Sequence, residues 1–152
     1  MLKKIASFTV DHRILKEGIY ISRTDGDVVT YDIRTRKPNA GDYMDNAAMH
    51  SVEHLFATLV RNSEIADSVI YFGPMGCQTG FYLLVRDVES AKVVAVIKAV
   101  LTGIIEYDGE MPGYSDFECG NYKNLDVDIA KRECADYYKK VAHLSDVMEY
   151  PV

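Results

Sequence analysis

The stretch GIYISRTDGDVVTYDIR, residues 18–34, contains two β-rich runs joined by a turn. Residues 18–23 and 28–34 carry many β-branched, aromatic and other apolar side chains, and TDGD at 24–27 is typical of a tight turn between strands. Strands joined by so short a turn pair antiparallel, because a parallel pair needs a long crossover connection. The stretch therefore predicts a β-hairpin and, with it, an antiparallel sheet.

Further periodic segments lie on both sides of this hairpin. In the longest helical segment, apolar residues recur three and four positions apart from Met49 to Val60. We expect strands at residues 5–10, 68–72 and 80–86, and helices at residues 46–62, 91–106 and 126–141. Asp45 or Asn46 is expected to cap the first helix and Ser90 the second. Helices packed on one face of a mainly antiparallel sheet form an α+β domain, which is the predicted fold class.

Length and composition narrow the class of protein. A chain of 152 residues can bury one hydrophobic core, so we expect a single domain over residues 1–152. The net charge of −6 argues against nucleic-acid binding, which needs a basic face. No apolar stretch reaches the ~20 residues of a membrane span, and no signal peptide is evident. Three irregularly spaced cysteines indicate reduced thiols, so the predicted location is the cytoplasm.

The strongest chemical signal is HSVEH at residues 50–54, within the first predicted helix. His50 and His54 are four positions apart, so both rings project from one face of the helix. This spacing suits one divalent metal ion, because imidazole is a common ligand of Zn and Fe(II). Glu53 lies beside the pair and could act as an acid–base group next to the metal. The competing interpretation is a pair of histidines on a solvated helix face.

The three cysteines differ in what their surroundings predict. Cys119 precedes a glycine late in a polar loop, where it could complete a His2Cys metal set with an open position, or be a surface thiol. Cys77 lies in MGCQTG at residues 75–80, where backbone amides favour a thiolate, although a buried turn residue fits as well. Cys134 falls on the inner stripe of the last helix and is expected to be a core residue.

Other interpretations stay open on these residues alone. HxxEH is also the pattern of the inverzincin peptidases, which need a third, glutamate ligand; Glu106, Glu110 and Glu118 are the candidates, but such peptidases are several times longer. A structural zinc would make the protein non-catalytic, but it needs four protein ligands, and a convincing fourth is missing. His12 and Arg34, at predicted strand ends, fit a site and the surface equally well.

Over nearly its whole length the chain resembles the S-ribosylhomocysteine lyases, also called autoinducer-2 synthases. The run PMGCQTGFY at residues 74–82, joined to the HxxEH helix, is highly specific. The residues that carry the resemblance are Ser7-Phe8, Asp11-His12, Asp32-Ile33-Arg34, Pro38-Asn39, His50-Ser51-Val52-Glu53-His54, Arg61, Pro74 to Tyr82, and Cys119-Gly120. The chain departs from the family pattern at Thr35, where an aromatic residue is usual, and at residues 71–73, where Asp-Ile-Ser is usual.

The resemblance implies a site, its ligands and an assembly. It implies one divalent metal per chain, expected to be Fe(II), with zinc or cobalt able to occupy the same ligands. The implied residues are His50, His54 and Cys119 as metal ligands, Cys77 and Glu53 as the catalytic acid–base pair, and Ser7, His12, Arg34 and Arg61 around the substrate. It also implies a homodimer with its sites at the subunit interface.

The implied reaction cleaves the thioether of S-ribosylhomocysteine. It releases homocysteine and 4,5-dihydroxypentane-2,3-dione, the precursor of a quorum-sensing signal. A thioether leaves poorly unless a carbonyl lies β to it, so the carbonyl must migrate along the ribose carbons through successive enediolates. A metal would stabilise their oxygens as a Lewis acid. A thiolate at Cys77 would move protons between carbons, and Glu53 would move them among the oxygens.

Overall fold

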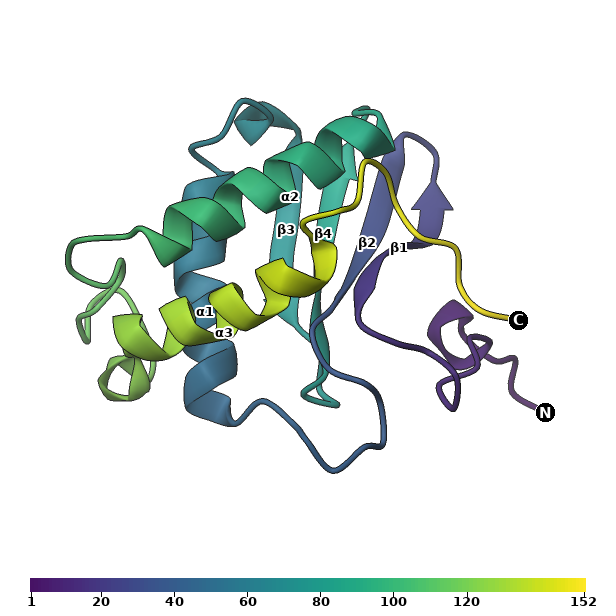
Figure 1. Ribbon diagram of the computed structural model, residues 1–152, viewed down its shortest axis with the longest axis horizontal. Helices are drawn as coiled ribbons and strands as arrows, with labels where there is room; N and C mark the ends of the chain where they lie inside the picture. Colours follow the sequence, from purple (N-terminus) through teal and green to yellow (C-terminus); the bar gives the residue numbers. More distant parts are fainter.

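The computed structural model describes all residues from 1 to 152 as one sheet with helices on one face (Figure 1). Four strands pair antiparallel in the order β1-β2-β4-β3. The strands are β1 (Gly18–Asp25), β2 (Val28–Arg34), β3 (Val69–Pro74) and β4 (Gly80–Arg86), and the helices are α1 (Asn46–Val60), α2 (Ser90–Ile105) and α3 (Val127–Val141). The predicted α+β class is confirmed, as is the hairpin of β1 and β2.

The register of the sheet brings distant residues together at one end of it. Arg34, the last residue of β2, pairs with Gly18 of β1 and with Gly80 of β4. A Cβ at position 80 would lie 2.4 Å from the carbonyl oxygen of Ile33, so only glycine lets the two backbones come this close. The β3–β4 loop, which carries Cys77, therefore lies beside the end of β2.

Stacked aromatic rings join α1 to the sheet. Phe56 of α1 stacks on Phe72 of β3 with the ring centroids 4.2 Å apart, and Phe72 stacks on Phe81 of β4 at 5.1 Å. All three side chains are buried in a core that also receives the apolar faces of α2 and α3. Burying one such side chain stabilises the fold by roughly 1.5–3 kcal/mol. This packing decides which face of α1 points inward. The face that carries the histidines is thereby left pointing away from the core.

The strand predicted at residues 5–10 is wrong. Residues Ala6–Phe8 form a single 3-10 turn, and Ile5 and Phe8 are 57% and 68% exposed. The loose apolar alternation in this segment has no neighbouring strand to pair with. An isolated strand leaves its backbone groups without partners and is not stable by itself.

The starts of the helices differ in how well they follow the sequence. Asp45 caps α1 by accepting a hydrogen bond from the Ala48 N–H at 2.8 Å. Of the two residues predicted for this cap, Asp45 and Asn46, the first is confirmed. The predicted cap at Ser90 is wrong, because Ser90 is already the first residue of α2 and Glu89 is the cap. The Ser90 hydroxyl instead donates to Asp146 at 2.6 Å. None of the helices combines the length and the hydropathy needed to cross a bilayer.

The C-terminal segment returns to the sheet and ends near the N-terminus (Figure 1). The Met148 N–H donates to the Ile19 carbonyl at 2.8 Å and forms a short bridge to β1. Tyr150 stacks on Tyr20 with the ring centroids 4.7 Å apart, and its hydroxyl donates to Asp32 at 2.7 Å. The tail thereby contacts the end of the sheet that lies beside Cys77.

Candidate active site

Helix α1 presents two histidines on one face. The rings of His50 and His54 are one helical turn apart, with centroids separated by 4.6 Å and ring planes at 88°. A different face of the helix carries the buried stripe that packs into the core, including Met49, Val52 and Phe56. Both imidazoles are half-buried. A well-packed helix therefore holds the two rings at a solvent-accessible surface.

A loop brings Cys119 to the same place. Cys119 lies between α2 and α3, and its Sγ is 3.4 Å from Nε2 of His50. Ring nitrogens of His50 and His54 and the sulfur of Cys119 all lie within 4.8 Å of one another. The Cys119 N–H donates to the Ser115 carbonyl at 3.1 Å, and the Asn121 N–H lies 3.4 Å from the sulfur. Local hydrogen bonds thus hold the thiol in position.

The second nitrogen of each ring has a partner of its own. The Nδ1–H of His54 donates to the Pro112 carbonyl at 2.8 Å, and Nδ1 of His50 is 2.5 Å from Oδ1 of Asn124. A carbonyl oxygen can only accept, so neutral His54 carries its proton on Nδ1 and has a free lone pair on Nε2. In a tetrahedral site with bonds of ~2.0–2.3 Å, neighbouring donors lie roughly 3.5 Å apart. The spacing of His50 and Cys119 fits, so the three residues form a group that could hold a metal ion.

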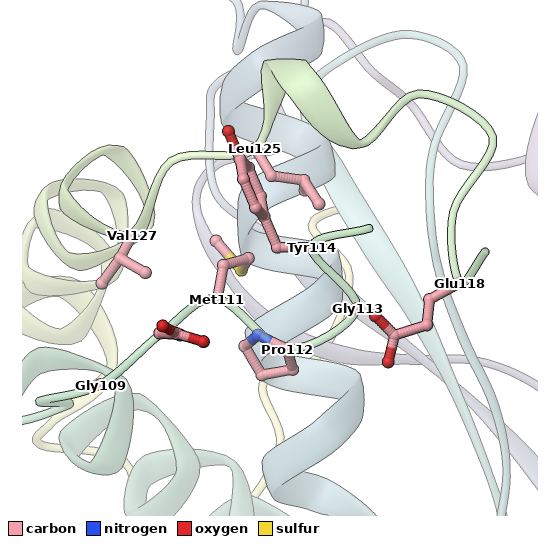
Figure 2. Close-up of a pocket in the computed structure, with 9 residues that line it drawn as sticks. Gly109, Met111, Pro112, Gly113, Tyr114, Glu118, Leu125 and Val127 are labelled. Atoms are coloured by element: carbon pink, nitrogen blue, oxygen red, sulfur yellow. The ribbon is translucent and has the colours of Figure 1, made fainter. Parts of the chain in front are cut away.

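The Pro112 residue that contacts His54 belongs to the lining of an open hollow, and Figure 2 shows the residues of this lining. The hollow has a volume of about 830 Å³ and is lined by residues 109–114 together with Glu118, Leu125 and Val127. Gly113 has a φ of +74°, and a Cβ there would lie 2.9 Å from Nδ1 of His54. Glycine at this position therefore allows the loop to bring its Pro112 carbonyl up to the imidazole.

Cys77 lies in a separate hollow of about 390 Å³. It is exposed on the β3–β4 loop, and its Sγ is 3.0 Å from Oγ1 of Thr79. His12 lines the same hollow, together with Asn39 and Tyr43 from the segment after β2. The structure therefore brings Cys77 and His12 together across a long stretch of sequence. None of the larger hollows of the chain is lined by both Cys77 and the three possible metal ligands.

Arg34 is buried rather than open to a ligand. Only 3% exposed, it donates through Nε and NH2 to the two carboxylate oxygens of Asp32 at 3.1 and 2.7 Å. Its NH1 donates at 2.8 Å to Oγ1 of Thr79, the same hydroxyl that contacts Cys77. Burial acts to lower the pKa of the Arg34 guanidinium, but the charge of Asp32 and its hydrogen bonds, together with the nearby Cys77 and Tyr150, raise the pKa by more. Arg34 thus reaches Cys77 through Thr79, and its contact with substrate stays a prediction.

The remaining predicted site residues are not gathered around Cys77. Ser7 lines a hollow of about 380 Å³ on the outer face of the sheet. Arg61 is exposed at the C-terminal end of α1 and donates to two carbonyl oxygens of β3. At 1.5 Å per helical residue it lies roughly 16 Å along the axis from His50. Glu53 is half-buried on α1, directly before His54. The roles predicted for these residues stay predictions.

Sequence reasoning missed three residues that support the histidine rings. Asn124 and Pro112 contact the rings directly, and the side chain of Asn46 lies 2.6 Å from that of Asn124. Asn46 carried a signal, because it precedes His50 by four positions and so shares its face of the helix. Nothing in the sequence placed the other two, since they belong to a loop far along the chain.

Cys134 is a core residue, as predicted. It is 2% exposed on the buried face of α3, and burial raises the pKa of its thiol to about 12. Because the raised pKa keeps the thiol neutral near pH 7, Cys134 is unsuited to act as a nucleophile or a base. Of the three cysteines, only Cys77 and Cys119 reach the surface.

Comparisons with known proteins show which family the chain matches. A family profile described as S-ribosylhomocysteinase (LuxS) matches residues 5–148. An S-ribosylhomocysteine lyase of Borreliella burgdorferi (strain ZS7) is 43% identical over 157 aligned positions, which cover 99% of this chain and 100% of the relative. A lyase of the same name from Desulfotalea psychrophila is 44% identical, with 92% of both chains covered. Another from Clostridium beijerinckii is 45% identical, with 86% of both chains covered.

Proposed function

The chain belongs to the S-ribosylhomocysteinase (LuxS) family, and on that premise we propose that it cleaves S-ribosylhomocysteine to homocysteine and 4,5-dihydroxypentane-2,3-dione. The observation that carries this proposal is the family match over residues 5–148. The group of His50, His54 and Cys119 supports it, because the reaction needs a Lewis acid and this group could hold one. The same matches give no support to the peptidase alternative.

The chain supplies the proton-transfer groups that the reaction needs. A metal held by His50, His54 and Cys119 would supply Lewis acidity toward the sugar oxygens. The thiolate of Cys77 takes a proton from one ribose carbon and returns it to the next, so that the carbonyl comes to lie β to the sulfur. Glu53 relays protons among the oxygens and helps to expel the homocysteine thiol.

Thr79 and Arg34 support the role proposed for Cys77. The Thr79 hydroxyl lies 3.0 Å from the sulfur and accepts a hydrogen bond from the Arg34 guanidinium. The guanidinium can only donate, so it uses a lone pair of the hydroxyl oxygen and not the hydroxyl proton. That proton is therefore free to be donated to a thiolate at Cys77. Because Arg34 is fixed by Asp32 inside the protein, this arrangement is in place before substrate arrives.

The native metal proposed for this group is Fe(II), at one ion per chain. Two imidazoles and one thiolate are ligands that Fe(II), zinc and cobalt all accept, so the ligand set permits substitution among them. Three protein ligands leave a coordination position for a substrate oxygen, unlike a structural zinc with four. Elemental analysis of protein purified without oxygen identifies the metal that the cell inserts.

The direct test is release of a free thiol from S-ribosylhomocysteine. We expect one thiol to appear, by a thiol reagent, for each substrate molecule consumed, together with one molecule of the dione. Protein stripped with a chelator should release thiol only at background rate, and adding back Fe(II) or Co(II) should restore the rate. Metal-loaded protein that consumes no substrate would contradict the proposal.

We place the active site at the interface of a homodimer. In one chain the possible metal ligands and Cys77 line no common larger hollow, which supports a site that a second copy completes. The helices cover only one face of the sheet. The outer face holds the hollow that Ser7 lines, walled by apolar and aromatic side chains such as Tyr71, Tyr82 and Leu84. Placing Ser7 in the interface would bring it to the partner's site.

Sedimentation equilibrium should therefore give twice the chain mass of 17.1 kDa. Tyr71, 52% exposed on the outer face, should be a sensitive position, because truncating a buried interface tyrosine commonly costs ~2 kcal/mol or more. Tyr71→Asp is expected to shift the protein toward monomer and to lower activity. Ala95→Asp, exposed on the helix-covered side, is the matched control and should stay dimeric. A wild-type protein that sediments as a monomer would contradict the assembly.

The proposed location is the cytoplasm, where homocysteine and the dione would be released. All three cysteines are free thiols, which suits a reducing compartment. The two products point to two uses in the cell: return of homocysteine to methyl-group metabolism, and supply of the precursor of a quorum-sensing signal.

A further inference from the structure

A chain of side-chain amides leads from the start of α1 to His50. Nδ2 of Asn124 donates to Oδ1 of Asn46 at 2.6 Å, and Oδ1 of Asn124 lies 2.5 Å from Nδ1 of His50. Asn46 is the first residue of α1 and lies one turn before His50. Asn124 ends the short 3-10 turn that precedes α3. Two residues after it, the Asp126 N–H donates to the buried Ser51 hydroxyl at 2.9 Å, which ties this segment to α1.

The donors and acceptors of these two amides decide which ring nitrogen of neutral His50 carries the proton. In the structure Asn46 accepts through Oδ1, and Asn124 turns its NH2 toward Asn46 and its oxygen toward the imidazole. An amide oxygen can only accept, so the proton of neutral His50 sits on Nδ1. Nε2, which faces the sulfur of Cys119, is then left with a free lone pair.

We propose that Asn124, oriented by Asn46, is a positioning residue that holds His50 in the tautomer able to bind the metal. This inference rests on the proposed metal group of His50, His54 and Cys119. The two histidines are held in different ways. His54 donates to a backbone carbonyl, which cannot reverse its polarity, whereas the amide of Asn124 can rotate and present NH2 instead. The hydrogen bond from Asn124 to Asn46 favours the orientation that the structure shows.

A rotated Asn124 amide would oppose metal binding. Its NH2 would donate to Nδ1 of His50 and so favour the tautomer with the proton on Nε2. That proton would occupy the lone pair that the metal needs. Loss of such an outer partner commonly costs ~10–100-fold in metal affinity, because the ring is no longer held in the ligating tautomer and orientation.

The test measures Co(II) affinity of the full-length protein by competition with a chromogenic chelator. Asn124→Ala should bind Co(II) ~10–100-fold more weakly than wild type. Asn124→Asp should restore wild-type affinity or exceed it, because a carboxylate can only accept from the Nδ1–H. Lys123→Ala, an exposed neighbour in the same turn, is the matched control and should be unchanged. Thermal unfolding of the metal-free variants should match wild type and so exclude a folding defect.

A double-mutant cycle separates orientation from simple packing. Asn46→Ala should weaken Co(II) binding by several-fold in the wild type, since Asn124 becomes free to rotate. Alanine is the best helix former, so α1 itself should not suffer. In the Asn124→Asp background the same change should have little effect, because both carboxylate oxygens are acceptors. An equal loss in both backgrounds, or wild-type affinity in Asn124→Ala, would overturn the proposal.

Co(II) affinity and thiol release test the positioning role of Asn124 and the proposed lyase activity separately. Wild-type protein that binds Co(II) and loses affinity on Asn124→Ala supports the positioning role whether or not homocysteine is released. Wild-type protein that binds no Co(II) overturns the positioning role together with the proposed metal group. The lyase activity is then tested independently, by release of free thiol from S-ribosylhomocysteine.

Discussion

His54→Ala is expected to empty the metal group and to abolish release of homocysteine. The change leaves His50 and Cys119 as the only ligands, and two donors do not hold a divalent ion against a chelator. The helix should survive, because alanine favours helix and His54 is half-buried outside the core stripe. The loss should therefore appear in metal content and activity and not in folding.

The measurement is metal per chain after dialysis against a mild chelator, followed by the thiol assay. Wild type should keep close to one metal per chain and His54→Ala close to none. His143→Ala is the matched control, since His143 is exposed after the end of α3 and away from the ligand group. Retention of one metal per chain by His54→Ala would show that the ligands have been wrongly assigned.

Most of the fold follows from local signals in the sequence. The TDGD turn joins the two runs that pair as β1 and β2, and the apolar spacing from Met49 to Val60 sets the buried face of α1. The failure at residues 5–10 has a physical cause: a strand depends on a partner, and the sequence of the segment says nothing about whether one is nearby. Strand order depends in the same way on contacts between distant segments.

The site likewise combines residues that are close in sequence with residues that only the fold brings together. His50 and His54 are one helical turn apart, so their proximity is a property of the sequence alone. Cys119 is separated from them by α2 and much of the sheet, so the residues alone left it as a ligand or a surface thiol, and the resemblance to a family favoured the ligand. The ion pair of Arg34 and Asp32 was within reach of sequence reasoning, because the two residues are two positions apart and lie on the same face of β2. The burial of the pair was not, because another pair with the same spacing in β1 is exposed.

Cys77→Ala is expected to stop the reaction at its first proton transfer while leaving the metal bound. Cys77 is not among the residues that could hold the metal, so metal content should match wild type. Alanine cannot accept a proton, so thiol release should fall by ~10²–10⁴-fold, the range typical of a lost general base. The fold should be unaffected, because Cys77 is exposed on a loop.

The distinguishing measurement is exchange of carbon-bound substrate hydrogens with solvent deuterium, followed by NMR beside the thiol assay. In Cys77→Ala this exchange should fall to the background rate, because no base removes the proton from carbon. Substrate binding alone cannot produce exchange, so the readout isolates proton abstraction from later loss of the thiol.

Cys134→Ala is the matched control for the loss of a thiol. Cys134 is buried in the core, with a pKa that burial raises to about 12, so it cannot supply a thiolate near neutral pH. Its replacement should cost ~1–2 kcal/mol of stability and leave turnover close to wild type. Near-normal thiol release from Cys77→Ala would remove Cys77 from the mechanism, because the base would then have to come from another residue. Loss of thiol release from a folded and metal-replete Cys134→Ala would show that the cysteines have been wrongly assigned.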